Sequence, residues 1–113
     1  MKKRTKKFAL RVIKLYAVLP KDTISQVIGN QLLRSGTSVG AHYREGLRAR
    51  SNAEFISKIE VALQELEESI YWMELIVESG IFPEVKMKNI LEEANELTAI
   101  FVTIVKKTKE YKK

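Results

Sequence analysis

Apolar residues recur at helical spacing in four separate segments of the chain. In the first, roughly residues 5–19, apolar positions return every three or four residues, and basic positions occupy the opposite side. Pro20 ends this helix, because the residue before a proline disfavours helical geometry. Its predicted core face consists of Phe8, Val12, Leu15 and Leu19, widened by Ala9, Ile13 and Tyr16.

The second segment begins after Asp22, whose carboxylate can accept hydrogen bonds from the free N–H groups of a first helical turn. Its middle is unusual, because residues 34–41 are mostly small, and Gly36 and Gly40 lie one turn apart. Such a run marks either a bend or break in the helix, or a close helix–helix approach. We expect a close approach with a local kink. The predicted core positions of this helix are Ile24, Val27, Ile28, Leu32 and Leu33.

The third segment is long and ends at Gly80, and either Ser51 or Asn52 can cap its beginning. The fourth follows Pro83, which suits the first turn of a helix, and residues 106–113 form a basic, fraying end. The predicted core stripes are Phe55, Ile59, Ala62, Leu66, Ile70, Met73 and Val77 in the third helix, and Ile90, Ala94, Leu97, Phe101, Ile104 and Val105 in the fourth.

A second apolar seam lies outside the core stripe of the third helix. Val61, Trp72 and Leu75 share this other side of the helix, near Glu65 and Glu68. The simpler interpretation is that the tryptophan lies over a neighbouring helix, but large aromatic residues away from a core are also common at subunit interfaces. We predict a homo-oligomer with Val61, Trp72 and Leu75 at or near its interface.

Four amphipathic helices with short connections predict an all-α fold, an antiparallel up-down four-helix bundle. The 113 residues, of which 45% are hydrophobic and 30% charged, are enough for a single domain over residues 1–113 with short basic termini. Five glycines and two prolines are too few for a many-stranded β protein. No signal peptide or membrane helix is predicted, and the absence of cysteine excludes disulfides, so we expect a cytoplasmic protein.

The net charge of +6 is unevenly distributed along the chain. Residues 1–20 hold seven basic side chains and no acid, whereas residues 51–80 hold seven glutamates and one lysine. Basic regions of this kind attract polyanions, although the same side chains can simply solvate helix faces or pair with glutamates. The candidate phosphate-binding residues are Arg34, Arg44, Arg48 and Arg50, with the first-helix face of Lys3, Lys7, Arg11 and Lys14 as a second candidate.

Catalysis has little support in the sequence. His42 is the single histidine, which excludes a histidine-pair metal site, and Ser35, Thr37 and Ser38 have no convincing base beside them. The glutamates of the third helix lack the Glu-x-x-His pairs of di-iron bundles. We therefore expect neither an enzyme nor a cofactor or metal, and no membrane partner.

Several runs of residues resemble one family of bacterial proteins. The runs are QLLRSGTSVGA at 31–41, YRE at 43–45, RARS at 48–51, AEFI at 53–56 and EESIYW at 67–72. They resemble the four-helix-bundle proteins encoded in intervening sequences of bacterial 23S ribosomal RNA, over roughly residues 8 to 105. The resemblance implies a left-handed bundle that assembles into a ring, typically a homopentamer, with a basic surface suspected of binding nucleic acid.

A related accessory protein of diversity-generating retroelements shares this architecture and contacts a reverse transcriptase and nucleic acid. Two positions depart from the family pattern: His42 replaces the usual Asn, which could alter a buried hydrogen bond, and Gly46 replaces the common Ala, which weakens the helix by up to ~1 kcal/mol.

Two functions are therefore open. One is a nucleic-acid-binding assembly module, which contacts the phosphates of RNA or DNA without reading bases. The other is a protein-interaction scaffold that docks a partner enzyme such as a reverse transcriptase and has no direct role with nucleic acid.

Overall fold

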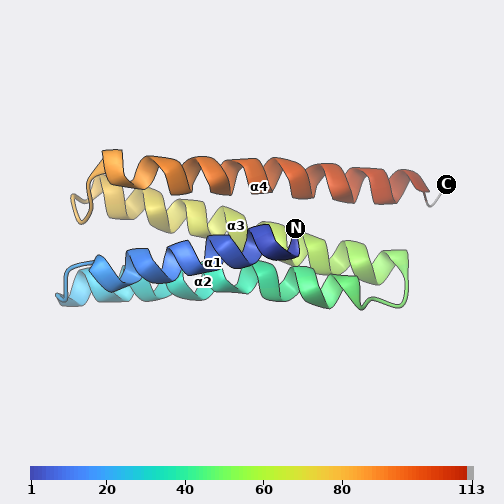
Figure 1. Cartoon of the computed structure of the whole chain (residues 1–113), viewed down its shortest axis with the longest axis horizontal. Coiled ribbons are helices and arrows are strands. Elements are labelled where there is room, and N and C mark those ends of the chain that lie inside the picture. The colour runs from blue at the N-terminus through green and yellow to red at the C-terminus, as the bar shows by residue number, and fades with distance from the viewer. Residues whose placement is uncertain (112–113) are drawn as a thin grey trace.

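The computed structural model describes residues 1–111, which fold into four antiparallel α-helices without any strand in that range (Figure 1). The bundle is elongated, 50 Å long and 21 Å across, and it confirms the predicted all-α fold. The helices are α1 (Lys2–Val18), α2 (Thr23–Leu47), α3 (Asn52–Glu78) and α4 (Glu84–Tyr111).

The four helices are not equally close to one another. α2 packs along both α1 and α3, and α3 also packs along α4, whereas α1 and α4 have the fewest contacts of the four neighbouring pairs. α1 is also the shortest helix, so its N-terminus lies about halfway along the bundle (Figure 1). The edge between α1 and α4 is consequently the most open seam of the bundle.

Local capping explains where α2 and α3 begin and where α3 ends. Asp22 accepts hydrogen bonds from the backbone N–H and the hydroxyl of Ser25, at 3.0 and 2.8 Å. At α3 the cap is Ser51, whose Oγ accepts the N–H of Glu54 at 3.1 Å. α3 ends in a Schellman motif at Gly80, whose φ of 79° suits glycine. α1 begins at Lys2, three residues earlier than its apolar pattern predicts.

The core confirms much of the pattern but corrects α2. The predicted face of α1 is buried, and so are five of the six positions of α4, with Ile104 half-buried. In α3 the stripe is shifted slightly, because Ile56, Ser69 and Ile76 are buried while Phe55, Ile70 and Val77 are half-buried. The predictions for Ile24 and Val27 are wrong: they are 66% and 57% exposed. Ile13 of α1 is also exposed.

The physical reason is that α2 faces its neighbours with small residues. Ser25, Gly29, Ser35, Gly36 and Gly40 are all buried, because they allow α1 and α3 to approach the α2 backbone. Apolarity alone therefore identifies the wrong side of this helix.

The close approach at the two central glycines is confirmed. A Cβ placed on Gly36 would lie 2.8 Å from a methyl carbon of Val12, and one on Gly40 would lie 3.1 Å from Oγ1 of Thr5. The helix is not broken there, since α2 runs without interruption from Thr23 to Leu47. Gly36 and Gly40 thus seat α1 against α2.

Candidate nucleic-acid interface

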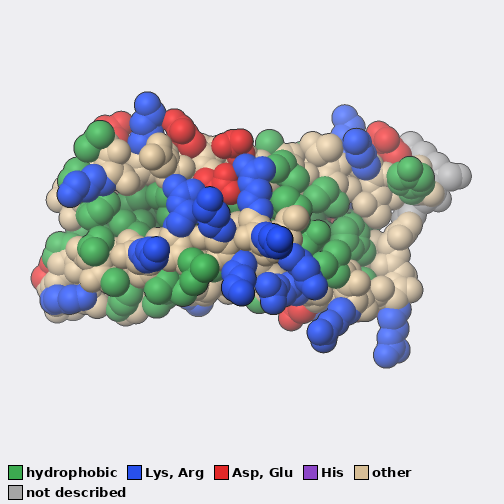
Figure 2. Space-filling model, in the orientation of Figure 1, with side chains coloured by type: hydrophobic (Ala, Val, Ile, Leu, Met, Phe, Trp, Pro, Cys, Tyr) green, Lys and Arg blue, Asp and Glu red, His purple; other side chains and the backbone are tan. Residues whose placement is uncertain are grey.

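Basic side chains line the open seam between α1 and α4. Lys3, Lys7 and Arg11 border a hollow of about 390 Å³ there, together with Arg4 and Glu93. Arg11 and Lys14 continue into a second hollow of about 330 Å³ that also reaches Lys86 of α4. Figure 2 shows Lys and Arg side chains gathered over this part of the molecule. We call Lys3, Lys7, Arg11, Lys14 and Lys86 the α1–α4 basic seam.

Helical spacing explains why α1 presents these cations together. Positions 3, 7, 11 and 14 are separated by four, four and three residues, so they follow one side of the helix. The opposite side carries the buried Phe8 and Val12. The second of the two sequence-predicted basic faces is therefore brought together by the fold.

One acidic group is built into the seam, and its charge is compensated. Arg4 donates two hydrogen bonds of 2.8 Å to the two carboxylate oxygens of Glu93, and a longer one of 3.4 Å to Glu96. The bonds from Arg4 hold the pKa of Glu93 below its ordinary value, and the positive charges of Arg11 and Lys7 add to the effect. Within residues 1–111, Lys3, Lys7, Arg11 and Lys14 form no ion pair.

The arginines of the other predicted group do not form one surface. Arg34 lies against α3, where it pairs with Glu65 at 3.2 Å and with Glu68. Arg44 is ten residues further along α2, about 15 Å along the helix axis, and borders a hollow with Lys6 and Thr5 of α1. Arg34 is therefore paired with acids of another helix, which could not be recognised from the residues next to it in the sequence.

Arg48 and Arg50 are exposed where α2 ends and the connection to α3 begins. The backbone N–H of Arg50 donates to a carboxylate oxygen of Glu54 at 3.2 Å, while its side chain has no ion pair among residues 1–111. These two arginines lie at an end of the bundle, apart from the α1–α4 basic seam.

His42 makes a surface contact and not the buried hydrogen bond that its position suggested. Its Nδ1 lies 3.3 Å from Oε2 of Glu45, which is also 3.4 Å from Nζ of Lys58. The hydrogen bond to His42 and then that to Lys58 lower the pKa of Glu45. Gly46, the second departure, is buried beside Ile59 and therefore fits a close approach of α3.

The hydroxyl groups in the small-residue run are used by the helices themselves. Thr37 and Ser38 donate to backbone carbonyls one turn earlier, at 2.7 Å each. Ser35 donates to the carbonyl of Leu32 and accepts the buried hydroxyl of Ser69 at 2.9 Å. These side chains act as packing groups, which agrees with their small size.

The apolar seam of α3 is half-exposed. Val61, Trp72 and Leu75 are each partly buried, and the Trp72 ring packs against the core and edge-on to Tyr71, 5.1 Å between centroids. The indole Nε1 is buried and has no hydrogen-bond acceptor among residues 1–111. A buried indole N–H usually finds a partner, so Trp72 is an exception within residues 1–111.

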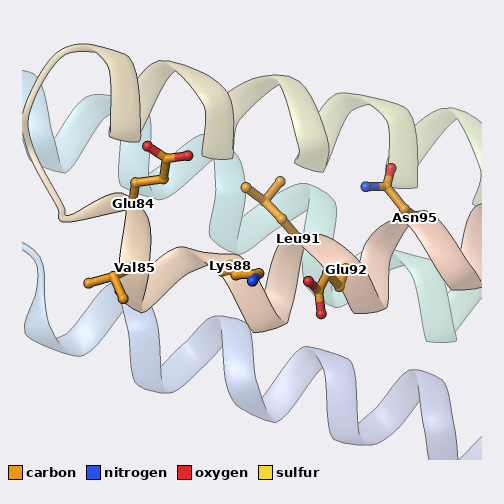
Figure 3. Close-up of a pocket in the computed structure, with 6 residues that line it drawn as sticks. All are labelled: Glu84, Val85, Lys88, Leu91, Glu92 and Asn95. Carbon is orange, nitrogen blue, oxygen red and sulfur yellow. The ribbon is translucent and has the colours of Figure 1, made fainter.

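A hollow on α4 offers no candidate catalytic or metal site. It measures about 470 Å³ and follows the outer side of α4 alone (Figure 3). Its side chains fan out along one helix and converge on no common point (Figure 3); they are Glu84, Val85, Lys88, Leu91, Glu92 and Asn95. Across residues 1–111 no group of three His, Cys, Asp or Glu residues could hold a metal ion, and no helix is long and apolar enough to cross a membrane.

Sequence reasoning missed the contribution of α4 to the basic seam. Lys86 lies in the first turn of α4 and borders the same hollow as Lys14, although the two are 72 positions apart. Only the packing of α1 beside α4 brings them together. The single available signal was the position of Lys86 just after the predicted helix start at Pro83.

Comparison with known proteins places these features in context. The family model for 23S rRNA-intervening sequence proteins matches residues 1–103. A crystal structure of a protein of unknown function from the S23 ribosomal protein family of Bacteroides thetaiotaomicron VPI-5482 has a TM-score of 0.88 and 35% sequence identity, covering 93% of this chain and 97% of that one. No curated protein matches the sequence.

Proposed function

The chain belongs to the 23S rRNA-intervening sequence protein family, and we propose that it is a non-enzymatic protein that binds the phosphate backbone of RNA or DNA along the α1–α4 basic seam. The observation that carries the proposal is the alignment of four cations of α1 with Lys86 of α4 along one seam. Lysine and arginine side chains without ion-pair partners are free to replace the counterions of a phosphate backbone.

The contacts proposed here do not read base sequence. Phosphate contacts fix position, whereas sequence is read by groups that reach base edges in a groove. The part of the α1–α4 basic seam around Glu93 offers ammonium and guanidinium groups on an open surface. Binding is therefore expected to depend on salt more than on sequence.

A charge-matched pair of variants tests the proposal. The double variant Lys7→Gln with Lys14→Gln removes two seam cations, and Lys88→Gln with Lys106→Gln removes two cations from the outer side of α4. Lys88 and Lys106 are 18 residues apart, five helical turns, and Lys88 borders the outer hollow. Affinity for labelled RNA and DNA is measured by fluorescence anisotropy across a salt series.

The seam variant should bind more weakly, and its slope of log Kd against log salt should flatten by about 1.4 to 1.8. The control variant should keep the wild-type slope. Equal losses of affinity in the two variants would show that only net charge matters and would refute binding along the α1–α4 basic seam. If the wild type binds neither RNA nor DNA, nucleic-acid binding is wrong and the interaction-scaffold function becomes the better explanation.

We also propose that the protein acts as a homo-oligomer that repeats the basic seam, with five copies being the number that the family resemblance implies. The proposed contact is the apolar seam of Val61, Trp72 and Leu75. The support is that Val61, Trp72 and Leu75 are only partly buried and that Ile24 and Val27 of α2 are exposed. Because Ser35 bonds Ser69 in antiparallel helices, the N-terminal turns of α2 lie beside the last turns of α3, just beyond Leu75.

Light scattering tests the oligomer with two neighbouring substitutions. Trp72→Glu places a charge in the proposed contact and should lower the molar mass of the assembly, whereas Tyr71→Glu alters an exposed ring and should leave it unchanged. Circular dichroism checks that both variants fold. A wild-type chain that is monomeric at micromolar concentration would refute this part of the proposal.

A further inference from the structure

The α1–α4 basic seam ends in a hollow that differs from the rest of the seam. It lies between the last turns of α1 and the first turns of α4, near the α3–α4 connection, and measures about 330 Å³. Cationic, amide and apolar side chains all border it: Arg11, Lys14, Leu15, Val18, Phe82, Lys86, Asn89 and Ile90. Figure 2 shows apolar side chains exposed between α1 and α4 to the left of the basic cluster.

Among residues 1–111, no carboxylate borders this hollow. The neighbouring hollow of the same seam contains Glu93, and the outer hollow of α4 contains Glu84 and Glu92. Arg11 and Lys14 on one side and Lys86 on the other therefore face the hollow from both helices without a neutralising acid on its walls. An anionic group would be held from two sides.

The apolar wall of the hollow is accessible. Val18 is 64% exposed, and Phe82 is half-buried with its ring 5.9 Å from Nζ of Lys86. Phe82 is anchored because its N–H bonds the carbonyl of Ile76 in the Schellman motif that ends α3. An aromatic ring thus lies beside Lys86 and borders the same hollow as Arg11 and Lys14, an arrangement that phosphate contacts alone do not require.

We infer that this hollow binds an unpaired nucleotide of a single-stranded nucleic acid. The base lies against Phe82 and Val18, its phosphate is held by Arg11, Lys14 and Lys86, and the Asn89 amide can hydrogen-bond a base edge. The inference rests on the proposed function, because it specifies the form of nucleic acid that the same seam binds. A duplex keeps its bases stacked inside and presents only its grooves and backbone, so it leaves the apolar wall unused.

Replacing the aromatic ring separates base stacking from phosphate attraction. Phe82→Leu keeps an apolar side chain and removes the ring, and Phe55→Leu makes the same change at a half-buried phenylalanine of α3. Affinity is measured for a short oligo(U) strand and for a duplex of similar length. Phe82→Leu should weaken strand binding at least about fivefold, with an unchanged salt slope and unchanged duplex binding, whereas Phe55→Leu should change neither.

A measurement on the wild type covers the case in which Phe82→Leu does not fold. Oligo(U) carrying 5-iodouracil is cross-linked by light, and the attachment point is found by mass spectrometry. Attachment at Phe82 or the adjacent first turn of α4 supports the inference, and attachment elsewhere overturns it. Equal weakening of strand and duplex by Phe82→Leu also overturns it and leaves the proposed function intact. Absence of any binding by the wild type refutes the proposed function itself.

Discussion

Gly36→Ala is the smallest change that tests the packing of α1 on α2. The new Cβ would lie 2.8 and 3.0 Å from the two methyl carbons of Val12. Val12 is fully buried and β-branched, so it cannot rotate away easily. Overpacking a core costs about 1–3 kcal/mol, while replacing glycine within a helix gains up to about 1 kcal/mol. The expected net effect is a loss of about 1 kcal/mol.

Gly46→Ala is the matched control within the same helix. Its Cβ would lie 3.3 Å from Cδ1 of Ile59, the movable end of a side chain, so little overpacking is expected. This variant should be neutral or slightly more stable than the wild type. The free energies of unfolding are measured by urea titration followed by circular dichroism. If Gly36→Ala is as stable as Gly46→Ala, the helices do not approach as closely at Gly36 as described.

Three further predictions concern single side chains. Asp22→Ala should lower the melting temperature at neutral pH, because it removes the cap of α2. Hydrogen bonds from Ser25 hold the pKa of Asp22 below its ordinary value of 3.8, so the cap stabilises the fold above pH 3.8 and is lost as the pH falls through the folded-state pKa. The melting curves of the variant and the wild type should therefore converge in acid. Ser69→Ala should cost about 1 kcal/mol in urea unfolding, since it removes a buried hydrogen bond. Glu93→Gln should strengthen RNA and DNA binding and steepen the salt slope by about one unit in anisotropy titrations, because it removes the carboxylate closest to Arg4, and unchanged binding would contradict this role of Glu93.

The helices and the family could be predicted because they depend on local signals. The recurrence of Phe8, Val12 and Leu15 and the cap at Asp22 depend only on residues close in sequence. The burial of α2 could not be predicted in the same way. Its contact face is made of serine and glycine, so hydrophobicity pointed to Ile24 and Val27, which are exposed.

The candidate site could also be predicted only in part, because the pairing of its charges depends on tertiary contacts. The cations of α1 were found from their spacing, since a helix repeats every 3.6 residues. Whether a cation is free depends on tertiary neighbours: Arg34 pairs with Glu65 and Glu68 on α3, while Lys14 borders the same hollow as Lys86 of α4. Pattern alone does not show which helices are adjacent.

Footprinting of lysines tests the α1–α4 basic seam most directly. Free protein and protein saturated with RNA or DNA are treated with an amine-reactive reagent, and the modification of each lysine is measured by mass spectrometry. Nucleic acid should protect Lys3, Lys7, Lys14 and Lys86, while Lys88 on the outer side of α4 should react equally in both samples. Protection of Lys88 with unchanged reactivity of the seam lysines would contradict the account.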